Sequence, residues 1–142
     1  MEQRVNLITL AVDDLAKAAA FYEALGWSRK KIEEDGIIVF NLLGQALGLY
    51  PKEGLAKDMG LEPSQIGGFS GVTLGYNVRQ KGEVDAIYRA AQEAGGRGLK
   101  APHEIFWGGY SSYIADLDGH VWEIAWNPFS PPREDGSFQW GG

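Results

Sequence analysis

Residues 6–27 read NLITLAVDDLAKAAAFYEALGW, and this stretch decides how the chain begins to fold. Its first part, Asn6–Val12, is short, apolar and rich in β-branched residues, which is typical of a strand. Asp13-Asp14 follows, and a carboxylate at this place can cap the start of a helix. Apolar side chains then recur at helical spacing until Gly26, a residue that commonly ends helices. The stretch therefore predicts a strand followed by a helix.

Three further strands are predicted to complete this unit, and the same order then returns in the second half of the chain. Glu34-Asp35-Gly36 is a good hairpin turn, and residues 51–68 are broken by glycines into a connector with a short helix near Gly54–Met59. The elements predicted beyond the opening stretch are, in chain order, the strands Trp27–Lys31, Ile37–Leu42, Ala46–Tyr50 and Gly71–Val78, the helix Glu83–Ala94, and the strands Arg97–Lys100, Gly109–Ala115 and Val121–Trp126.

The two halves also correspond in sequence. Ile8–Val12 matches Val72–Tyr76, and each match is followed by a predicted helix that ends at a glycine. We therefore predict an α+β fold of two strand–helix–three-strand modules within one domain, residues 4–129. A single module would leave one apolar sheet face uncovered, so the modules are expected to pair within one chain or between two chains. The predicted parts are module one at 4–51, a connector at 52–69, module two at 70–127 and a C-terminal tail at 130–142.

Composition limits the class of protein. The chain has 142 residues, which suits one domain, and its formal net charge is −6. The sequence has no basic patch, so nucleic acid is not an expected partner. It has no cysteine, no secretion signal and no apolar run long enough to span a membrane. We therefore expect a cytoplasmic protein without a membrane partner.

Three stretches of the chain resemble the vicinal oxygen chelate superfamily, which includes glyoxalase I, bleomycin-resistance proteins and extradiol dioxygenases. They are ITLAVDDLAKAAAFYEALGW at residues 8–27, GVTLGYNV at 71–78 and WGGYSSYIADLDGHVWEIAWNPF at 107–129. The resemblance covers about residues 5–129. It implies paired βαβββ modules with mixed sheets that each curl around a cleft, and a frequent homodimer.

Catalytic members of this superfamily hold one divalent metal, with ligands from four strands. The resemblance assigns the four positions to Leu7, Gly48, Gly71 and Glu123. Only the last of these can bind a metal, and the two histidines of the chain, His103 and His120, lie in a predicted loop and a predicted turn. A catalytic zinc site takes about three protein ligands. We therefore expect no metal cofactor, and a divalent metal in an unusual site is the alternative.

Glu123 is the leading candidate for a catalytic residue. The alternation of the last strand directs it into the cleft that the resemblance implies, where a carboxyl group can serve as a general acid or base. Thr9, Thr73 and Asn77 are its expected neighbours if the strands alternate as predicted. These polar groups are candidate ligand-binding residues, or they satisfy a Glu123 that is kept for structure.

Aromatic side chains supply the other binding candidates. Trp107 and Tyr110 flank Gly108-Gly109, and glycines let a loop approach a ligand closely. We predict that both rings form a stacking wall at the mouth of the cleft, and the alternative is a Trp107 that anchors the loop to the core. Tyr50, at the end of its strand, is predicted to line the cleft of module one.

These residues favour a protein that binds a small organic molecule without the metal of the superfamily, as a bleomycin-resistance protein sequesters its ligand. The alternative is an enzyme, a lyase, isomerase or dioxygenase-like oxidoreductase, that uses an atypical metal site or Glu123 as a general base. A third reading is a structural or regulatory dimer whose cleft is filled. The sequence contains no phosphate-binding loop and no nucleophile with a paired base.

Overall fold

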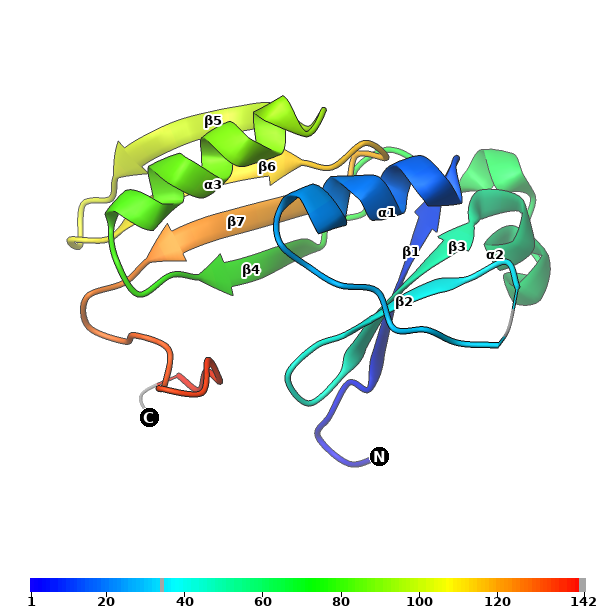
Figure 1. Cartoon of the computed structure of the whole chain (residues 1–142), viewed down its shortest axis with the longest axis horizontal. Coiled ribbons are helices and arrows are strands. Elements are labelled where there is room, and N and C mark those ends of the chain that lie inside the picture. Colours follow the sequence, from blue (N-terminus) through cyan, green and yellow to red (C-terminus); the bar gives the residue numbers. More distant parts are fainter. Residues whose placement is uncertain (34, 141–142) are drawn as a thin grey trace. The chain divides into compact units, whose positions relative to one another are not determined.

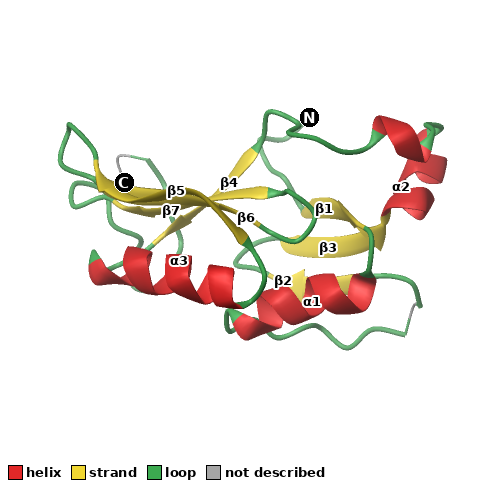
Figure 2. Cartoon of the chain, turned by 90° about the horizontal axis from the view of Figure 1, so that it is seen from above, coloured by secondary structure: helices red, strands yellow, loops and turns green. Residues whose placement is uncertain are grey.

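Two strand-and-helix units make up the structure, a computed structural model that describes residues 1–33 and 35–140 (Figure 1). The first unit is Met1–Gly68 and the second is Phe69–Gly142. Each unit has its own mixed β-sheet with a helix along one face (Figure 2). The α+β class predicted from the sequence is therefore confirmed. No helix within the described residues is long and apolar enough to cross a membrane.

The first unit is built on a three-stranded sheet in the order β1-β3-β2. β1 runs parallel to β3, and β2 runs antiparallel to it. The short helix predicted in the connector is present as α2, and a 3-10 helix follows it. The elements are β1 (Leu7–Val12), α1 (Leu15–Ala24), β2 (Ile38–Asn41), β3 (Ala46–Pro51), α2 (Lys52–Met59) and the 3-10 helix (Pro63–Gln65).

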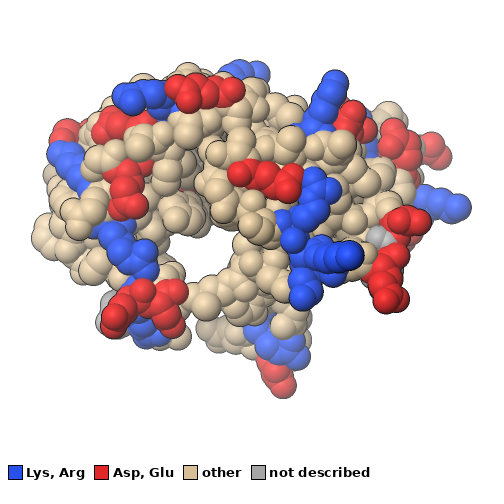
Figure 3. Space-filling view, viewed as in Figure 1, with Lys and Arg blue, Asp and Glu red and all other residues tan. Residues whose placement is uncertain are grey.

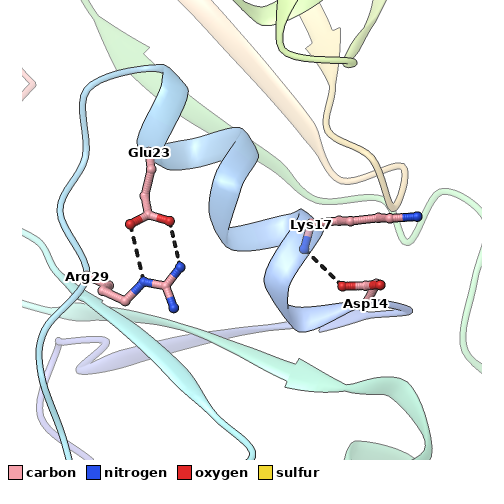
Figure 4. Close-up of polar contacts among 4 residues, drawn as sticks. All are labelled: Asp14, Lys17, Glu23 and Arg29. Atoms are coloured by element: carbon pink, nitrogen blue, oxygen red, sulfur yellow. Dashed lines mark hydrogen bonds and ion pairs between the residues drawn. The ribbon is translucent and has the colours of Figure 1, made fainter.

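Side-chain contacts fix both ends of α1 (Figure 4). At its start, the Asp14 carboxylate accepts a hydrogen bond from the Lys17 backbone N–H at 2.9 Å, as predicted for a helix cap. Near its end, the Arg29 guanidinium donates to both carboxylate oxygens of Glu23, at 2.6 and 3.2 Å. This hydrogen bonding lowers the pKa of Glu23 below its ordinary value.

The core of the first unit lies between α1 and the sheet. Alternate side chains of all three strands point to the helix and are buried, because successive residues of a strand face opposite ways. Trp27 closes the core beyond the end of α1, where its ring stacks on Tyr22 at 5.3 Å and packs on Phe40 at 5.6 Å. The buried side chains are Leu10, Val12, Phe40, Leu47 and Leu49 of the strands and Ala18, Ala19, Phe21 and Tyr22 of the helix.

The prediction of a strand at Trp27–Lys31 is wrong. Only Lys30 forms an isolated bridge, with Val39, through its backbone N–H. Residues 28–31 read SRKK and are exposed, so they offer no apolar side chains to cover the sheet edge, while Trp27 is drawn into the aromatic cluster instead. The first module is therefore βαββ within the described residues. In the predicted turn that follows, Asp35-Gly36 forms a turn and Glu34 lies outside the described residues.

The second unit has the predicted order of a strand, a helix and three strands. Its four-stranded sheet runs β4-β7-β6-β5, with β4 parallel to β7 and the other pairs antiparallel. β5 is longer than predicted and contains Pro102, which an edge strand tolerates. The elements are β4 (Thr73–Asn77), α3 (Gly82–Glu93), β5 (Arg97–Glu104), β6 (Tyr110–Ala115) and β7 (Val121–Trp126).

α3 covers one face of this sheet and packs on β5, β6 and β7 (Figure 2). Ile114, Trp122 and Ile124 are buried on that face, and Val84 and Ala91 are buried on the helix. The opposite face of β4, β7 and β6 carries polar side chains together with small apolar ones, and its residues Ser111 and Ala115 are buried. The tail beyond β7 is held to the unit by Arg79, whose guanidinium donates to the backbone carbonyls of Arg133 and Glu134.

Candidate functional site

The face of the second sheet that points away from α3, here called the open face, carries the strongest candidate site. Its residues follow from the strand register, since paired residues of neighbouring strands share a face. β4, β7 and β6 each contribute three residues to it in the region of Glu123. They are Thr73, Gly75 and Asn77 of β4, Val121, Glu123 and Ala125 of β7, and Ser111, Tyr113 and Ala115 of β6.

Glu123 lies at the centre of the open face, half-buried between a tyrosine and a glycine. On one side it pairs with Tyr113, whose hydroxyl donates a hydrogen bond to the Glu123 Oε2 atom at 3.2 Å. On the other side it pairs with Gly75 of β4. A Cβ atom built on Gly75 would meet no other atom within 4 Å. The missing side chain therefore leaves an open space next to the carboxylate.

Tyr113 keeps its proton as the pH rises. Partial burial raises the pKa of the Tyr113 hydroxyl, and the charge of Glu123 and the hydrogen bond to it raise this pKa further. The phenol therefore remains a hydrogen-bond donor throughout the neutral range. A phenol that donates to a carboxylate can orient that carboxylate toward a ligand, or return a proton to a substrate from which Glu123 has taken one.

The second carboxylate oxygen of Glu123 has no partner among the residues that the structure describes. Tyr113 donates to Oε2, and no hydrogen bond or ion pair joins Oε1 to any of the described residues. A half-buried carboxylate loses part of its hydration without gaining a full set of partners. Together with the space over Gly75, this makes Glu123 the group on the open face that is best placed to meet a small molecule.

Two of the three neighbours expected for Glu123 lie on the same face. Thr73 and Asn77 flank Gly75 on β4, each about 7 Å along the strand from it. Thr9 lies on β1 of the first unit, where it pairs with Gly48. The structure thus brings Thr73 and Asn77 together with Glu123 and places Thr9 on another sheet.

Trp107 and Tyr110 lie apart from Glu123. Tyr110 shares the helix-covered face with its partner Trp126, and its hydroxyl donates to the Asp85 carboxylate of α3 at 2.8 Å. The Trp107 ring folds back on Gly109, so closely that a Cβ atom there would lie 2.2 Å from it. It remains 42% exposed. Gly109 is four residues from Tyr113 along the chain, so the ring lies at the far end of the strand.

Tyr50 lies on the face of the first sheet that is turned away from α1, and α2 holds it there. Its ring packs over Gly54, where a Cβ atom would meet the Tyr50 hydroxyl at 3.1 Å. The negative charge of Asp58, and a hydrogen bond to it, raise the pKa of this hydroxyl. Asp58 therefore engages the polar end of Tyr50 within the first unit.

The sequence of residues 4–124 matches the family model of the Glyoxalase/Bleomycin resistance protein/Dioxygenase superfamily. The chain belongs to this superfamily. It is similar to the crystal structure of a glyoxalase-related enzyme from Fulvimarina pelagi, with 34% sequence identity and a TM-score of 0.89. That similarity covers 99% of this chain and 100% of the other. A search of curated proteins gave no match.

More distant superfamily structures share the fold. A glyoxalase/bleomycin resistance protein/dioxygenase family enzyme from Burkholderia phytofirmans PsJN is 23% identical, with a TM-score of 0.73 over 85% of this chain and 96% of that chain. A lactoylglutathione lyase from Agrobacterium tumefaciens is 21% identical, with a TM-score of 0.65 over 89% of this chain and 96% of that chain. At these identities the similarity shows the fold alone.

The residues of this chain do not fit the divalent metal that is usual in the superfamily. Leu7 and Gly48 offer no donor side chain, and Gly71 lies before β4 with a positive φ of 88°. No group of three or more His, Cys, Asp or Glu side chains that could hold a metal occurs in residues 1–33 and 35–140. The Nδ1 atom of His103 lies 2.9 Å from the carbonyl oxygen of Ala101.

The strand register also changes which residue is the counterpart of Glu123 in the first unit. Ala11 pairs with Tyr50 as Gly75 pairs with Glu123, and the sequence repeat matches Ala11 to Gly75. Tyr50, two residues from Gly48 on the same face, is therefore the equivalent position. The Tyr50 hydroxyl is hydrogen-bonded to Asp58. Replacing Gly48 by Tyr50 as the equivalent position therefore does not give the first unit a set of metal ligands.

Tyr113 and Gly75 are site residues that sequence reasoning missed. The signal for Tyr113 was available, because the turn Asp116–Gly119 joins two antiparallel strands and counting back from it places Tyr113 opposite Glu123. Gly75 carries no chemistry of its own in the sequence. Its importance depends on the parallel register of β4 and β7, which no local pattern specifies.

Proposed function

We propose that this superfamily member binds a small organic molecule on the open face of its second sheet, without the family's usual metal site. The observation that carries the proposal is the unused Oε1 atom of Glu123 beside the open space at Gly75. A binding site needs a concave space and a few fixed polar groups. The proposal is supported by the open position at Gly75 and by the fixed polar pair of Glu123 and Tyr113 beside it.

The kind of binding we propose is sequestration, as in bleomycin-resistance proteins, with no chemical change of the ligand. Leu7 and Gly71 at two of the family's four ligand positions, and Tyr50 in place of a carboxylate at the third by strand register, support this reading. Glu123 remains at the fourth, where a hydrogen bond from Tyr113 now holds it. A carboxylate released from metal binding is available for direct contact with a ligand.

The test is a screen of small aromatic and glycopeptide-like compounds against the isotope-labelled protein, followed by amide chemical shifts. A ligand is expected to move the signals of residues 73–77, 111–115 and 121–125 in a saturable way. Gly75→Val should remove the response, because the new side chain fills the space beside Glu123. Gly82→Ala is the matched control, since Gly82 is also open but lies in the first turn of α3. Absence of any saturable ligand on this face would contradict the proposal.

A second candidate function is metal-independent acid–base catalysis by Glu123. The hydrogen bond between Tyr113 and Glu123 favours it, because a carboxylate and a phenol in contact can take and return a proton in sequence. The 34% identity to a glyoxalase-related enzyme supports it as well. Glu123→Gln should then abolish turnover of any identified substrate and leave the circular dichroism spectrum unchanged.

Elemental analysis of protein purified without chelators separates both candidates from a metal enzyme. A stoichiometric transition metal would overturn the metal-free reading, whereas we expect none. We also propose that the chain forms a homodimer, as superfamily members often do, and light scattering after gel filtration tests this. Location in the cytoplasm stays a prediction.

A further inference from the structure

We propose that the ligand presents a cationic hydrogen-bond donor, a primary ammonium or an amidinium, to Glu123 in the space over Gly75. This inference rests on the proposed function and names the chemical class of its ligand. Three features of the open face carry it: the hydrogen bonding of Glu123, the charges around it, and the shape beside it.

The hydrogen bonding of Glu123 leaves its Oε1 atom able to accept a hydrogen bond from a ligand. Tyr113 satisfies Oε2 from the β6 side, at 3.2 Å. On the β4 side stands Gly75, so no side chain reaches Oε1 from there. Bonds from N–H groups of cations to carboxylates are shorter and stronger than neutral hydrogen bonds. A cationic donor therefore gains more at Oε1 than a neutral one.

The charge around Glu123 points the same way. Among the residues of β4, β7 and β6 on the open face, Glu123 is the one charged side chain, and the described residues provide it with no ion-pair partner. The nearest cationic residues by register are on β5, one strand beyond Tyr113, where Lys100 pairs with Tyr113 and Arg97 pairs with Ala115. The chain as a whole carries a net charge of −6. On the one face of the molecule that Figure 3 displays, Lys and Arg side chains are interspersed with Asp and Glu side chains. An anionic ligand would meet repulsion at Glu123, and a cation would neutralise it.

The shape beside Glu123 suits a small group. A glycine between Thr73 and Asn77 removes one side chain from the layer while polar groups remain two residues away on either side. Either the Thr73 hydroxyl or the Asn77 side-chain carbonyl, each about 7 Å along the strand from Gly75, can accept a further proton of an ammonium or amidinium. The free edge of β4 leaves the space open for a larger body attached to that group.

The experiment compares benzylamine, benzamidine, benzyl alcohol and benzoate as probes of similar size in amide-shift titrations of the full chain. We expect the two cations to bind about tenfold or more tightly than the alcohol, and benzoate to bind least. Glu123→Gln should lower the affinity for the two cations to the affinity for benzyl alcohol. Glu93→Gln, which removes an exposed carboxylate at the end of α3, should change nothing.

Each contrary result has a definite meaning. Equal affinity for cations and alcohol, or cation binding that survives Glu123→Gln, overturns the inference while a ligand on the open face still supports the proposed function. If Glu123→Gln does not fold, Gly75→Val provides the second test. This substitution must weaken the binding of the cations, because it fills the space while the carboxylate stays in place. Binding of a screened compound without any response to the probes overturns only the inference. Failure of probes and screen together overturns both.

Discussion

The two sheets of this protein are alike on one face and different on the other. On their helix-covered faces both bury apolar side chains, such as Leu47 and Leu49 in the first unit and Ile114 and Ile124 in the second. On the opposite faces, the equivalent residues Tyr50 and Glu123 make different contacts. Tyr50 is engaged by Asp58 of a neighbouring helix, whereas Glu123 keeps a free oxygen beside an empty position.

The comparison indicates that the helix-covered faces of the two sheets maintain the fold, whereas the opposite face of the second sheet provides the candidate site. Burial of apolar area stabilises each unit, so the loss of an apolar side chain on the helix-covered face lowers the stability of the fold. The opposite faces are packed less uniformly, because Glu123 and Tyr50 are half-buried there whereas Ser111 and Ala115 are buried. Of the four positions that the superfamily resemblance assigns to metal ligands, those of Leu7 and Gly71 carry no donor side chain, and the strand register places Tyr50 rather than Gly48 at a third.

The first prediction compares the two faces of the first sheet. Phe40 is 1% exposed and packs on Tyr22 and Trp27, so Phe40→Ala should destabilise the protein by about 3–5 kcal/mol. Leu7 is 52% exposed on the other face, and Leu7→Ala should cost less than about 1 kcal/mol. Urea denaturation of both variants measures the difference in the free energy of unfolding. Similar losses of stability in the two variants would show that the two faces do not differ in this way.

The second prediction compares two glycines of the second sheet. A Cβ atom at Gly98 would lie 2.1 Å from the Tyr88 hydroxyl of α3, so Gly98→Ala should destabilise by about 1–3 kcal/mol. Gly75 faces open space with an ordinary φ, and Gly75→Ala should be neutral within about 0.5 kcal/mol. Thermal unfolding of the two variants decides the point. A large loss for Gly75→Ala would show that the position is not open.

The third prediction compares the starts of the two main helices. The Asp14 side chain caps α1, so Asp14→Ala should destabilise by about 1 kcal/mol. In α3 the Glu83 carboxylate accepts hydrogen bonds from the backbone N–H groups of Arg79 and Gln80, so Glu83→Ala should cost a similar amount. Asp14→Asn, which keeps an acceptor, is the matched control and should retain most of the stability when chemical denaturation curves are compared.

The smallest effect concerns ionisation of Tyr113. Burial and the Glu123 carboxylate raise its pKa, so the protonated form is favoured in the folded chain. Its contribution to stability is therefore complete below the pKa of an unfolded tyrosine, about 10, and is lost as the pH rises through the higher folded value. Glu123→Gln should lower the Tyr113 pKa toward that ordinary value in an NMR titration of the ring. An unchanged pKa would show that the two groups do not interact in solution.

Local patterns were enough to predict most of the fold. Helix caps, helix-ending glycines and strand alternation gave the element order of the second unit and the orientation of Glu123 on a face of β7, because each depends on residues close in the chain. The strand predicted at Trp27–Lys31 failed for a reason that is not local. Trp27 finds partners in Tyr22 and Phe40, and the charged residues after it cannot replace that burial.

The site was less predictable because it depends on register and on distant elements. Tyr110 and Gly109 are adjacent, yet one faces α3 and the other faces the Trp107 ring, so a single step in register decides the role of each. The contact of Tyr50 with Asp58 requires the position of α2. No pattern around Glu123 itself shows that a glycine stands beside it on the parallel strand.

The most direct measurement is a crystal structure of the protein, purified without chelators, in complex with the amine or amidine that binds most tightly. We expect ligand density over Gly75, with the cationic nitrogen within hydrogen-bonding distance of the Glu123 carboxylate, the Tyr113 hydroxyl still donating to that carboxylate, and no metal ion. A metal ion bound to Glu123, or a ligand seated away from the open face, would show that Glu123 and the space over Gly75 are not a metal-free binding site.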